Sequence, residues 1–490
     1  MEYIKPLRNY LRKFDLISFL KAIWYLSNHL EFRRPLPDYL RGANPYNFKS
    51  NLHLSFFLWE LDTLSREVIL HCEPFFGQKI TEWNQIAIAL NRLKKAEQDA
   101  LEVDEYSVFS ELSRIAHRQF HWQQGITYND LIRTRKIYRS DGMNSVVRHV
   151  YGMSTEQVAL SGFSALATYL EHFAITNEWA GNAEKVIGHS PLALITNLTA
   201  DLMDIRKMTH DVRRLDSNWA YAFNPLWLYP LIRIDDGKRI ICPMPGLLAR
   251  RITEGLYFDI AGHNVDVLSE HMGPAFQAYV GEVLNRTNSG QFKIQAEKTY
   301  GTKKKPKDTV DWIVEDASAS LFIEVKILKM ARAAKEYLAP YAAVTTELKK
   351  LAKAAGQLYS TLTDALAGRY PHWEPNEKPI HPLIVTLDNW NLFTHNAFGE
   401  LQNLIGDELD RRGIARSIIK DHQYVVCCSS ELEFAIQVMA QTGIHEVMKG
   451  LTSGDKIGWL FSGHLRSEFS KQFANVKPLF PEERDNFLPR

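Results

Sequence analysis

The chain has 490 residues, of which 45% are hydrophobic and 23% are charged, a composition typical of a folded protein with roughly two to four domains. Its formal net charge of +1 excludes a global basic field, so any attraction for nucleic acid has to be local. The four cysteines show no CxxC spacing, which argues against a zinc ribbon and favours a reducing, cytoplasmic setting. No apolar run approaches the ~18 residues of a membrane span, and the N-terminus lacks the apolar core of a signal peptide, so we expect no membrane segment.

Residues 1–225 are predicted to form a helical region. Apolar residues recur at helical spacing from Leu16 and again from Leu54, and Ser154 with Gln157 has the pattern of a capping box that starts a further helix. No GxxxxGK[ST] or GxGxxG motif is present, which argues against a nucleotide-driven motor. Whether this region is a sensor, a regulatory module or an assembly module that contacts a protein partner stays open. Other helical patterns cover roughly residues 82–100, 107–122, 128–139 and 200–215.

Two clusters in this region have both a chemical and a plain interpretation. His117 and His121 lie four apart with Glu111 nearby, a spacing that can hold a metal ion. The pattern lacks a third ligand and the Glu of HExxH, so a polar helix face is the favoured interpretation. The second cluster consists of Arg133, Arg135, Lys136 and Arg139. It could contact phosphate, but a solvated helix face is the favoured interpretation.

The sequence changes character near residue 225. Two β-rich runs flank the turn Asp235–Lys238, which predicts a hairpin, and Leu247–Ile260 then has a helical pattern. We therefore place a domain boundary near residue 225 and expect residues 226–264 to be a hairpin and helix that lead into the next domain.

The next segment is predicted to supply a helix, a strand and a basic loop. Gly273-Pro274 starts a helix whose apolar stripe includes Phe276 and Val280, and Glu282 lies at the margin of that stripe. Residues 292–300 alternate apolar and polar side chains, as expected for a strand. The loop that follows is rich in lysine and contains Lys303, Lys304, Lys305 and Lys307.

The stretch from Asp308 to Lys326, DTVDWIVEDASASLFIEVK, contains two β-type runs joined by a polar connection and predicts a hairpin. Strand periodicity places Glu324 and Lys326 on one face of the second run, and Asp311 points away from the apolar side chains of the first. If the strands pair with their apolar faces together, Asp311, Glu324 and Lys326 converge. Two carboxylates beside an ammonium group suit a hard divalent cation and an activated water.

Asp311, followed by Glu324-Val325-Lys326 on the next strand, resembles the PD-(D/E)XK, or restriction-endonuclease-like, nuclease superfamily, with Val310 at the place of the motif's nominal proline. The order of elements is also similar: a helix with an acidic residue, a strand, a strand with Asp and a strand with Glu-x-Lys. The resemblance implies that Asp311 and Glu324 hold Mg²⁺, or Mn²⁺ as a substitute, with Glu282 assisting. It implies that Lys326 orients the attacking water and stabilises the charge that builds on the phosphate.

A long helix is expected after the site, because apolar residues recur at helical spacing from Val344 to Ala365. Superfamily members often carry a Gln near the active centre on this helix, and Gln357 resembles it, although a solvated basic face is an equal alternative. Apolar runs at 380–387 and 424–429 predict buried strands. The expected nuclease domain therefore spans 265–445, and a mainly helical tail spans 446–490.

The expected fold class is α+β: a large helical N-terminal region followed by a mixed β-sheet flanked by helices in a restriction-endonuclease-like core. Residues 291–353 carry 13 Lys/Arg against 8 Asp/Glu, an excess of five that is a modest signal for an anionic partner. The residues expected to contact nucleic acid are Lys303, Lys304, Lys305, Lys307, Lys350 and Lys353.

The leading hypothesis is a Mg²⁺-dependent endonuclease that cuts double-stranded DNA, and the resemblance suggests bacterial restriction or anti-phage defence. A homodimer or higher homo-oligomer is expected, because cutting both strands usually takes two active sites. Two alternatives stay open. One is a catalytically inactive nuclease fold that serves as a nucleic-acid-binding or scaffold protein, and the other is an RNA-cleaving nuclease or toxin.

Overall fold

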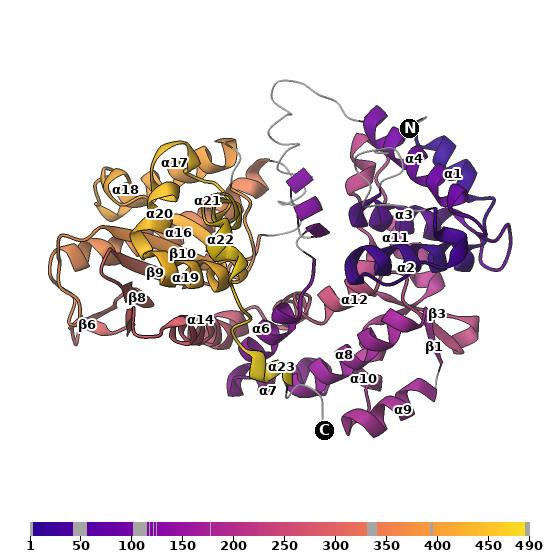
Figure 1. The fold of residues 1–490 in the computed structure, drawn as a ribbon, viewed down its shortest axis with the longest axis horizontal. Helices are drawn as coiled ribbons and strands as arrows, with labels where there is room; N and C mark the ends of the chain where they lie inside the picture. The colour runs from indigo at the N-terminus through magenta and orange to yellow at the C-terminus, as the bar shows by residue number, and fades with distance from the viewer. Residues whose placement is uncertain are drawn as a thin grey trace. The chain divides into compact units, whose positions relative to one another are not determined.

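The computed structural model describes residues 3–42, 56–100, 115–116, 118–120, 122–123, 125–176, 178–330, 341–392 and 395–485. The chain forms two compact units. The first comprises Met1–Ser107, Arg118–Asn264 and Glu482–Arg490, and the second comprises Val108–His117 and Val265–Pro481. Helices dominate the first unit, whereas the second combines a central sheet with helices (Figure 1). The α+β class expected from the sequence, with a helical N-terminal region and mixed sheets after it, is confirmed at this level.

The first unit is built around a large apolar core to which its N-terminal helices contribute. The predicted capping box at the start of α8 is confirmed, because the Gln157 N–H donates to Ser154 Oγ at 3.2 Å and the Ser154 N–H donates to Gln157 Oε1 at 2.9 Å. The α-helices described in this unit are α1 Lys5–Leu11, α2 Leu16–Phe32, α3 Leu58–His71, α4 Trp83–Ala100, α6 Tyr128–Tyr138, α7 Asp141–Tyr151, α8 Thr155–Glu171, α9 Glu178–Ile187, α10 Leu192–Asn197, α11 Leu202–Asp211, α12 Pro245–Arg251 and α13 Leu256–His263.

A four-stranded sheet also belongs to the first unit. The hairpin predicted around Asp235–Lys238 is present as β3 (Leu231–Ile234) and β4 (Arg239–Ile241), which pair antiparallel. It does not lead into the second unit, because β4 pairs with β1 (Ala174–Thr176) and β3 pairs with β2 (Thr199–Asp201). The first unit therefore continues to Asn264. The sequence missed β1 and β2 because strands of three residues are too short to show a period.

The second unit contains a five-stranded mixed sheet in the order β11-β10-β9-β8-β5. Its strands are β5 Lys293–Ala296, β8 Trp312–Glu315, β9 Ser320–Lys326, β10 Ile380–Thr386 and β11 Val425–Cys428. β5, β8 and β9 pair antiparallel, whereas β10 runs parallel to both β9 and β11. All residues of β10 are buried, as the apolar run at 380–387 predicted.

Helices cover both faces of this sheet. α16 shares an apolar cluster with Ile313 and Phe322, whereas α14 lies against the neighbouring side chain, Trp312, whose Nε1 donates to Gln277 O at 3.2 Å. Because successive strand residues point to opposite faces, α14 and α16 lie on opposite sides of the sheet. The α-helices of this unit are α14 Gly273–Thr287, α16 Tyr341–Leu366, α17 His395–Arg412, α18 Ile418–Asp421, α19 Ser429–Thr442, α20 Ile444–Thr452, α21 Phe461–Glu468 and α22 Ser470–Ala474; α23 Pro481–Asp485 follows at the junction with the first unit.

The segment from 297 to 308 differs from the sequence prediction. The single strand expected over 292–300 is divided into β5 and β6 (Thr299–Thr302), and the expected lysine-rich loop forms a turn and β7 (Lys305–Asp308). β6 and β7 pair antiparallel as a separate two-stranded sheet. All of β7 is exposed. Because neither face is buried, the sequence shows no alternation there.

Within the described ranges, no helix is long and apolar enough to cross a membrane. All four cysteines are buried with free thiols.

Gly281→Ala is expected to destabilise the protein, although alanine favours helices over glycine. The added Cβ would collide with the Trp312 ring, which packs on α14, and such overpacking costs about 1–3 kcal/mol. Gly399 in α17 has no atom within 4 Å of the equivalent position, so Gly399→Ala is expected to gain up to about 1 kcal/mol. Urea unfolding of both variants measures these effects. A stabilised Gly281→Ala variant would contradict the packing of Trp312 on this helix.

The contribution of His381 to stability is expected to fall as the pH decreases from about 6.5 to 4. His381 on β10 is buried, and burial, with neighbouring His445 and His422, lowers its pKa to about 4. In this window the unfolded chain binds a proton that folded His381 does not, so unfolding is favoured by acid. In His381→Phe, the slope of the unfolding free energy against pH is expected to become shallower, by an amount that corresponds to at most one bound proton. An unchanged slope would contradict the lowered pKa, and exposed His210→Phe serves as the control.

Candidate active site

The β8–β9 ladder brings the three predicted residues to one place. Trp312 pairs with Ile323 and Ile313 pairs with Phe322, so one step further along the ladder Asp311 lies opposite Glu324. Asp311 and Glu324 therefore share the face that Ile313 and Phe322 present to α16. This arrangement follows from the period-two alternation that the sequence shows in both runs.

Direct contacts hold this trio in position. The Val325 N–H donates to Asp311 Oδ2 at 2.6 Å, which fixes the Asp311 carboxylate against the neighbouring strand. Lys326 Nζ lies 2.7 Å from Glu324 Oε1. The Glu324 side chain is only 3% exposed, whereas the Lys326 side chain is 29% exposed. The ammonium group can thus pair with a buried carboxylate and still reach a molecule in solvent.

The carboxylates of Asp311 and Glu324 repel each other when both are ionised. Burial, followed by the charge of Glu324, raises the pKa of Asp311 to about 7. Burial also raises the pKa of Glu324, against the opposing effect of Lys326. Two carboxylates and one ammonium group leave one negative charge uncompensated when both acids are ionised. A bound cation or a proton would remove this imbalance.

Glu297 is a third carboxylate beside the pair, and the sequence interpretation did not single it out. Its N–H donates to Asp311 O at 2.9 Å, and its charge raises the pKa of both Asp311 and Glu324. Gln277 of α14 donates from Nε2 to Glu297 Oε2 at 3.2 Å. Glu297 is identified only once β5 pairs with β8, a contact that the local pattern does not contain.

Tyr370 also borders the pair and was missed by the sequence interpretation. Its hydroxyl accepts the Val310 N–H at 3.1 Å. Burial raises the pKa of Tyr370 to about 12, and the negative charge of Glu324 acts in the same direction. The ring lies 6.3 Å from that of Phe322. A lone Tyr in an irregular segment carries no signal that would predict this contact.

Glu282 and Gln357 do not join the trio. Glu282 is exposed and lines a hollow with Gly281 and Trp312. The residue of α14 that contacts a carboxylate of the site is Gln277, which binds Glu297. Gln357 is exposed on α16, because it lies off the buried stripe of that helix, and no hydrogen bond among the described residues joins it to Asp311, Glu324 or Lys326. The expected roles of Glu282 as a cation ligand and Gln357 as an active-site residue are therefore not supported by their positions.

The acidic pair provides hard oxygen donors, although its donor set is small. No group of three or more His, Cys, Asp or Glu side chains is close enough to hold a metal ion in the part of the chain that is described. The residues that fit a divalent cation are Asp311 and Glu324, because their negative charge is buried and only partly compensated. The alternative HxxxH cluster at His117 and His121 lies outside the described residues.

The predicted nucleic-acid-binding lysines fall into two groups. Lys307 Nζ lies 2.6 Å from Asp364 Oδ2, and Lys350 Nζ lies 2.7 Å from Glu347 Oε1, so both charges are paired within the protein. The remaining four lysines are exposed, and they are Lys303, Lys304, Lys305 and Lys353. In the first unit, the basic cluster of α6 is engaged by acidic side chains, namely Asp130, Glu156 and Glu483.

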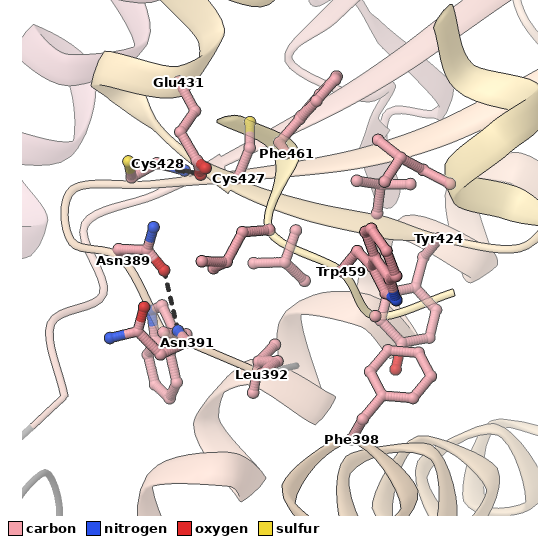
Figure 2. A pocket seen from close by; sticks show the side chains of 16 residues that line it. Asn389, Asn391, Leu392, Phe398, Tyr424, Cys427, Cys428, Glu431, Trp459 and Phe461 are labelled. Carbon is pink, nitrogen blue, oxygen red and sulfur yellow. Dashed lines mark hydrogen bonds between the residues drawn. The ribbon is translucent and has the colours of Figure 1, made fainter. Parts of the chain in front are cut away.

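A separate hollow lies along β11 and the segment that follows β10 (Figure 2). It is lined by Asn389, Leu392, Phe398, Cys427 and Trp459, among others, and its cavity volume is about 30 Å³. This volume suits about two water molecules rather than an organic substrate. The buried Cys427 thiol is a poor nucleophile because burial raises its pKa. The trio of Asp311, Glu324 and Lys326 therefore remains the better candidate for an active site.

No protein-family model, curated protein or solved structure matches this chain. The function has to be inferred from the site geometry.

Mg²⁺ or Mn²⁺ is expected to raise the thermal unfolding midpoint. A ligand that binds only the folded state stabilises it by about 2.7 kcal/mol at 100 times its dissociation constant. Glu324→Gln is expected to abolish this shift and Glu297→Gln to reduce it. Glu282→Gln, the matched control on α14, is expected to retain it. A shift lost in Glu282→Gln but kept in Glu297→Gln would contradict this assignment of the cation site.

Proposed function

We propose that the second unit is a Mg²⁺-dependent nuclease that hydrolyses phosphodiester bonds in DNA. The observation that carries this proposal is the convergence of Asp311, Glu324 and Lys326 on adjacent strands β8 and β9. Acidic oxygens beside an ammonium group suit a reaction in which a divalent cation and a phosphate meet. No nucleophilic Ser, Cys or His is needed, because water can attack phosphorus.

Each residue has a distinct task in this proposal. Asp311 and Glu324 supply the oxygen ligands, and the Val325 N–H holds the Asp311 carboxylate in a fixed orientation. Glu297, the residue that follows β5, adds negative charge and is itself held by Gln277. A divalent cation bound to this pair would act as a Lewis acid and lower the pKa of a water molecule.

Lys326 is the residue suited to contact the phosphate. Its ammonium group is paired with Glu324 but is partly exposed, so it can approach a non-bridging phosphate oxygen without losing its charge. Negative charge builds on those oxygens during hydrolysis, and a fixed ammonium group stabilises it. The pairing with Glu324 restricts the position of the ammonium group before substrate arrives.

The cellular setting and the assembly are part of the same proposal. Four buried free thiols suit a reducing, cytoplasmic environment. Cleavage of both strands of a duplex would need two copies of the site, which favours a homodimer.

Purified protein is expected to cleave plasmid or linear DNA with Mg²⁺ or Mn²⁺ and to be inactive with EDTA. Glu324→Gln is expected to abolish cleavage, and Lys326→Ala to lower the rate by about 10²–10³-fold, the usual cost of removing one donor to a developing oxyanion. Gel assays on DNA and RNA measure these rates.

The matched control is the exposed Glu446 and Lys449 pair on α20, whose atoms lie 2.6 Å apart. Glu446→Gln and Lys449→Ala are expected to cleave like the wild type. Cleavage that survives Glu324→Gln would sink the site assignment. Folded wild-type protein that cleaves neither DNA nor RNA would favour a binding or scaffold role, and cleavage of RNA alone would replace the DNA substrate.

A further inference from the structure

The β6–β7 hairpin is anchored to the body of the second unit by one buried carboxylate. Asp364 of α16 accepts hydrogen bonds from the Tyr300 hydroxyl and from Lys307 Nζ, each at 2.6 Å, and Arg369 Nη1 binds its other oxygen. These donors come from β6, from β7 and from the segment after α16. One side chain thus fixes both strands of an otherwise exposed hairpin.

The tip of the hairpin carries positive charge that the protein does not compensate. Lys303 and Lys304 form the turn, and Lys305 begins β7. All three are exposed, and none has an ion-pair partner among the described residues. Asp364 pairs with both Lys307 and Arg369, whereas the lysines at the tip have no such acidic partner in the part of the chain that is described.

The base of the hairpin is joined to the acidic site. Lys298 and Thr309 exchange two hydrogen bonds of 2.9 and 3.1 Å, immediately beside the bond from the Glu297 N–H to Asp311 O. The Tyr300 ring lies 5.5 Å from the Tyr370 ring. The position of the hairpin is therefore fixed relative to Asp311 and Tyr370.

The shape and composition of the hairpin select among nucleic acids. A two-stranded ribbon, with strands about 4.8 Å apart, is narrow enough for the B-form major groove, which is about 12 Å wide. The major groove of A-form RNA is deep and narrow and does not admit such elements. Residues 301–308, GTKKKPKD, contain no aromatic side chain on which an unpaired base could stack.

We propose that the β6–β7 hairpin is an arm that enters the major groove of double-stranded DNA, with Asp364 as the residue that positions it. The lysines at the tip bind phosphates along the groove, so the contact depends on charge rather than on base sequence. This inference rests on the proposed function, because it names the substrate of the same site. The arm would place the duplex backbone beside Asp311, Glu324 and Lys326.

Fluorescence anisotropy in EDTA tests the arm without requiring cleavage. The wild type is expected to bind duplex DNA more tightly than duplex RNA or single-stranded DNA of the same length. The slope of log affinity against log salt is negative. In the double variant Lys303→Ala/Lys304→Ala, its magnitude is expected to become smaller by about 1.8, at 0.9 for each lost phosphate contact. The control is Lys420→Ala/Lys471→Ala, two exposed lysines elsewhere in this unit, which is expected to match the wild type.

Limited trypsin digestion tests the positioning role of Asp364. Cleavage after Lys303 and Lys304 is expected to be slow in the wild type and slower with duplex DNA. Asp364→Asn is expected to accelerate cutting at these two bonds by releasing the hairpin, and Asp364→Glu is expected to restore part of the protection. Faster cutting throughout the unit, without preference for the hairpin, would overturn the role of Asp364.

The two proposals fail separately. Duplex DNA binding that depends on Lys303 and Lys304, without cleavage under any metal condition, would support the arm and overturn the nuclease. Metal-dependent cleavage with unchanged DNA binding in the lysine variant would overturn the arm and leave the nuclease standing. Equal binding of duplex DNA and duplex RNA would overturn the major-groove contact.

Discussion

Two carboxylates lie opposite each other on neighbouring strands, with only one ammonium group to balance them. Asp311 and Glu324 are both held in a largely buried position, and each would be more stable if a proton or a cation were bound. A fold gains nothing in stability from such a pair, because burying like charges is costly. The cost is understandable if the pair serves to bind a cation, and the rest of the second unit can be understood as the support that keeps the pair in place.

That support comes from helices on both faces of the sheet that contains β8 and β9. On one face α14 packs on Trp312 with Gly281 at the contact, and the same helix holds Glu297 through Gln277. On the other face α16 covers Phe322 and holds the β6–β7 hairpin through Asp364. The two helices thus link the acidic pair to Glu297 and to the β6–β7 hairpin, which forms a sheet of its own.

The sequence predicted those parts of the site whose geometry is local. Strand alternation fixes the faces of Asp311, Glu324 and Lys326 within a few residues, and the structure brings these three together. Helical periodicity shows which stripe is buried but not which polar neighbour reaches a distant strand, and Glu282 and Gln357 both lie at exposed helix positions apart from the trio. Glu297, Tyr370 and Asp364 depend on the pairing of β5 with β8 or on contacts with α16, and these non-local contacts leave no pattern in the sequence. The hairpin around Asp235–Lys238 was expected to lead into the next domain, and its pairing with β1 and β2 was missed for the same reason, since these strands are only three residues long.

A crystal structure determined with Mn²⁺, with diffraction recorded at the manganese absorption edge, tests the central claim most directly. The account predicts an anomalous peak between the carboxylates of Asp311 and Glu324, with manganese–oxygen distances of about 2.1–2.2 Å, near those of other hard divalent cations. Glu297 would lie beside this peak, and Glu282 would not contact the ion. A peak at another position, or no peak at saturating Mn²⁺, would contradict the assignment of this pair as a cation site.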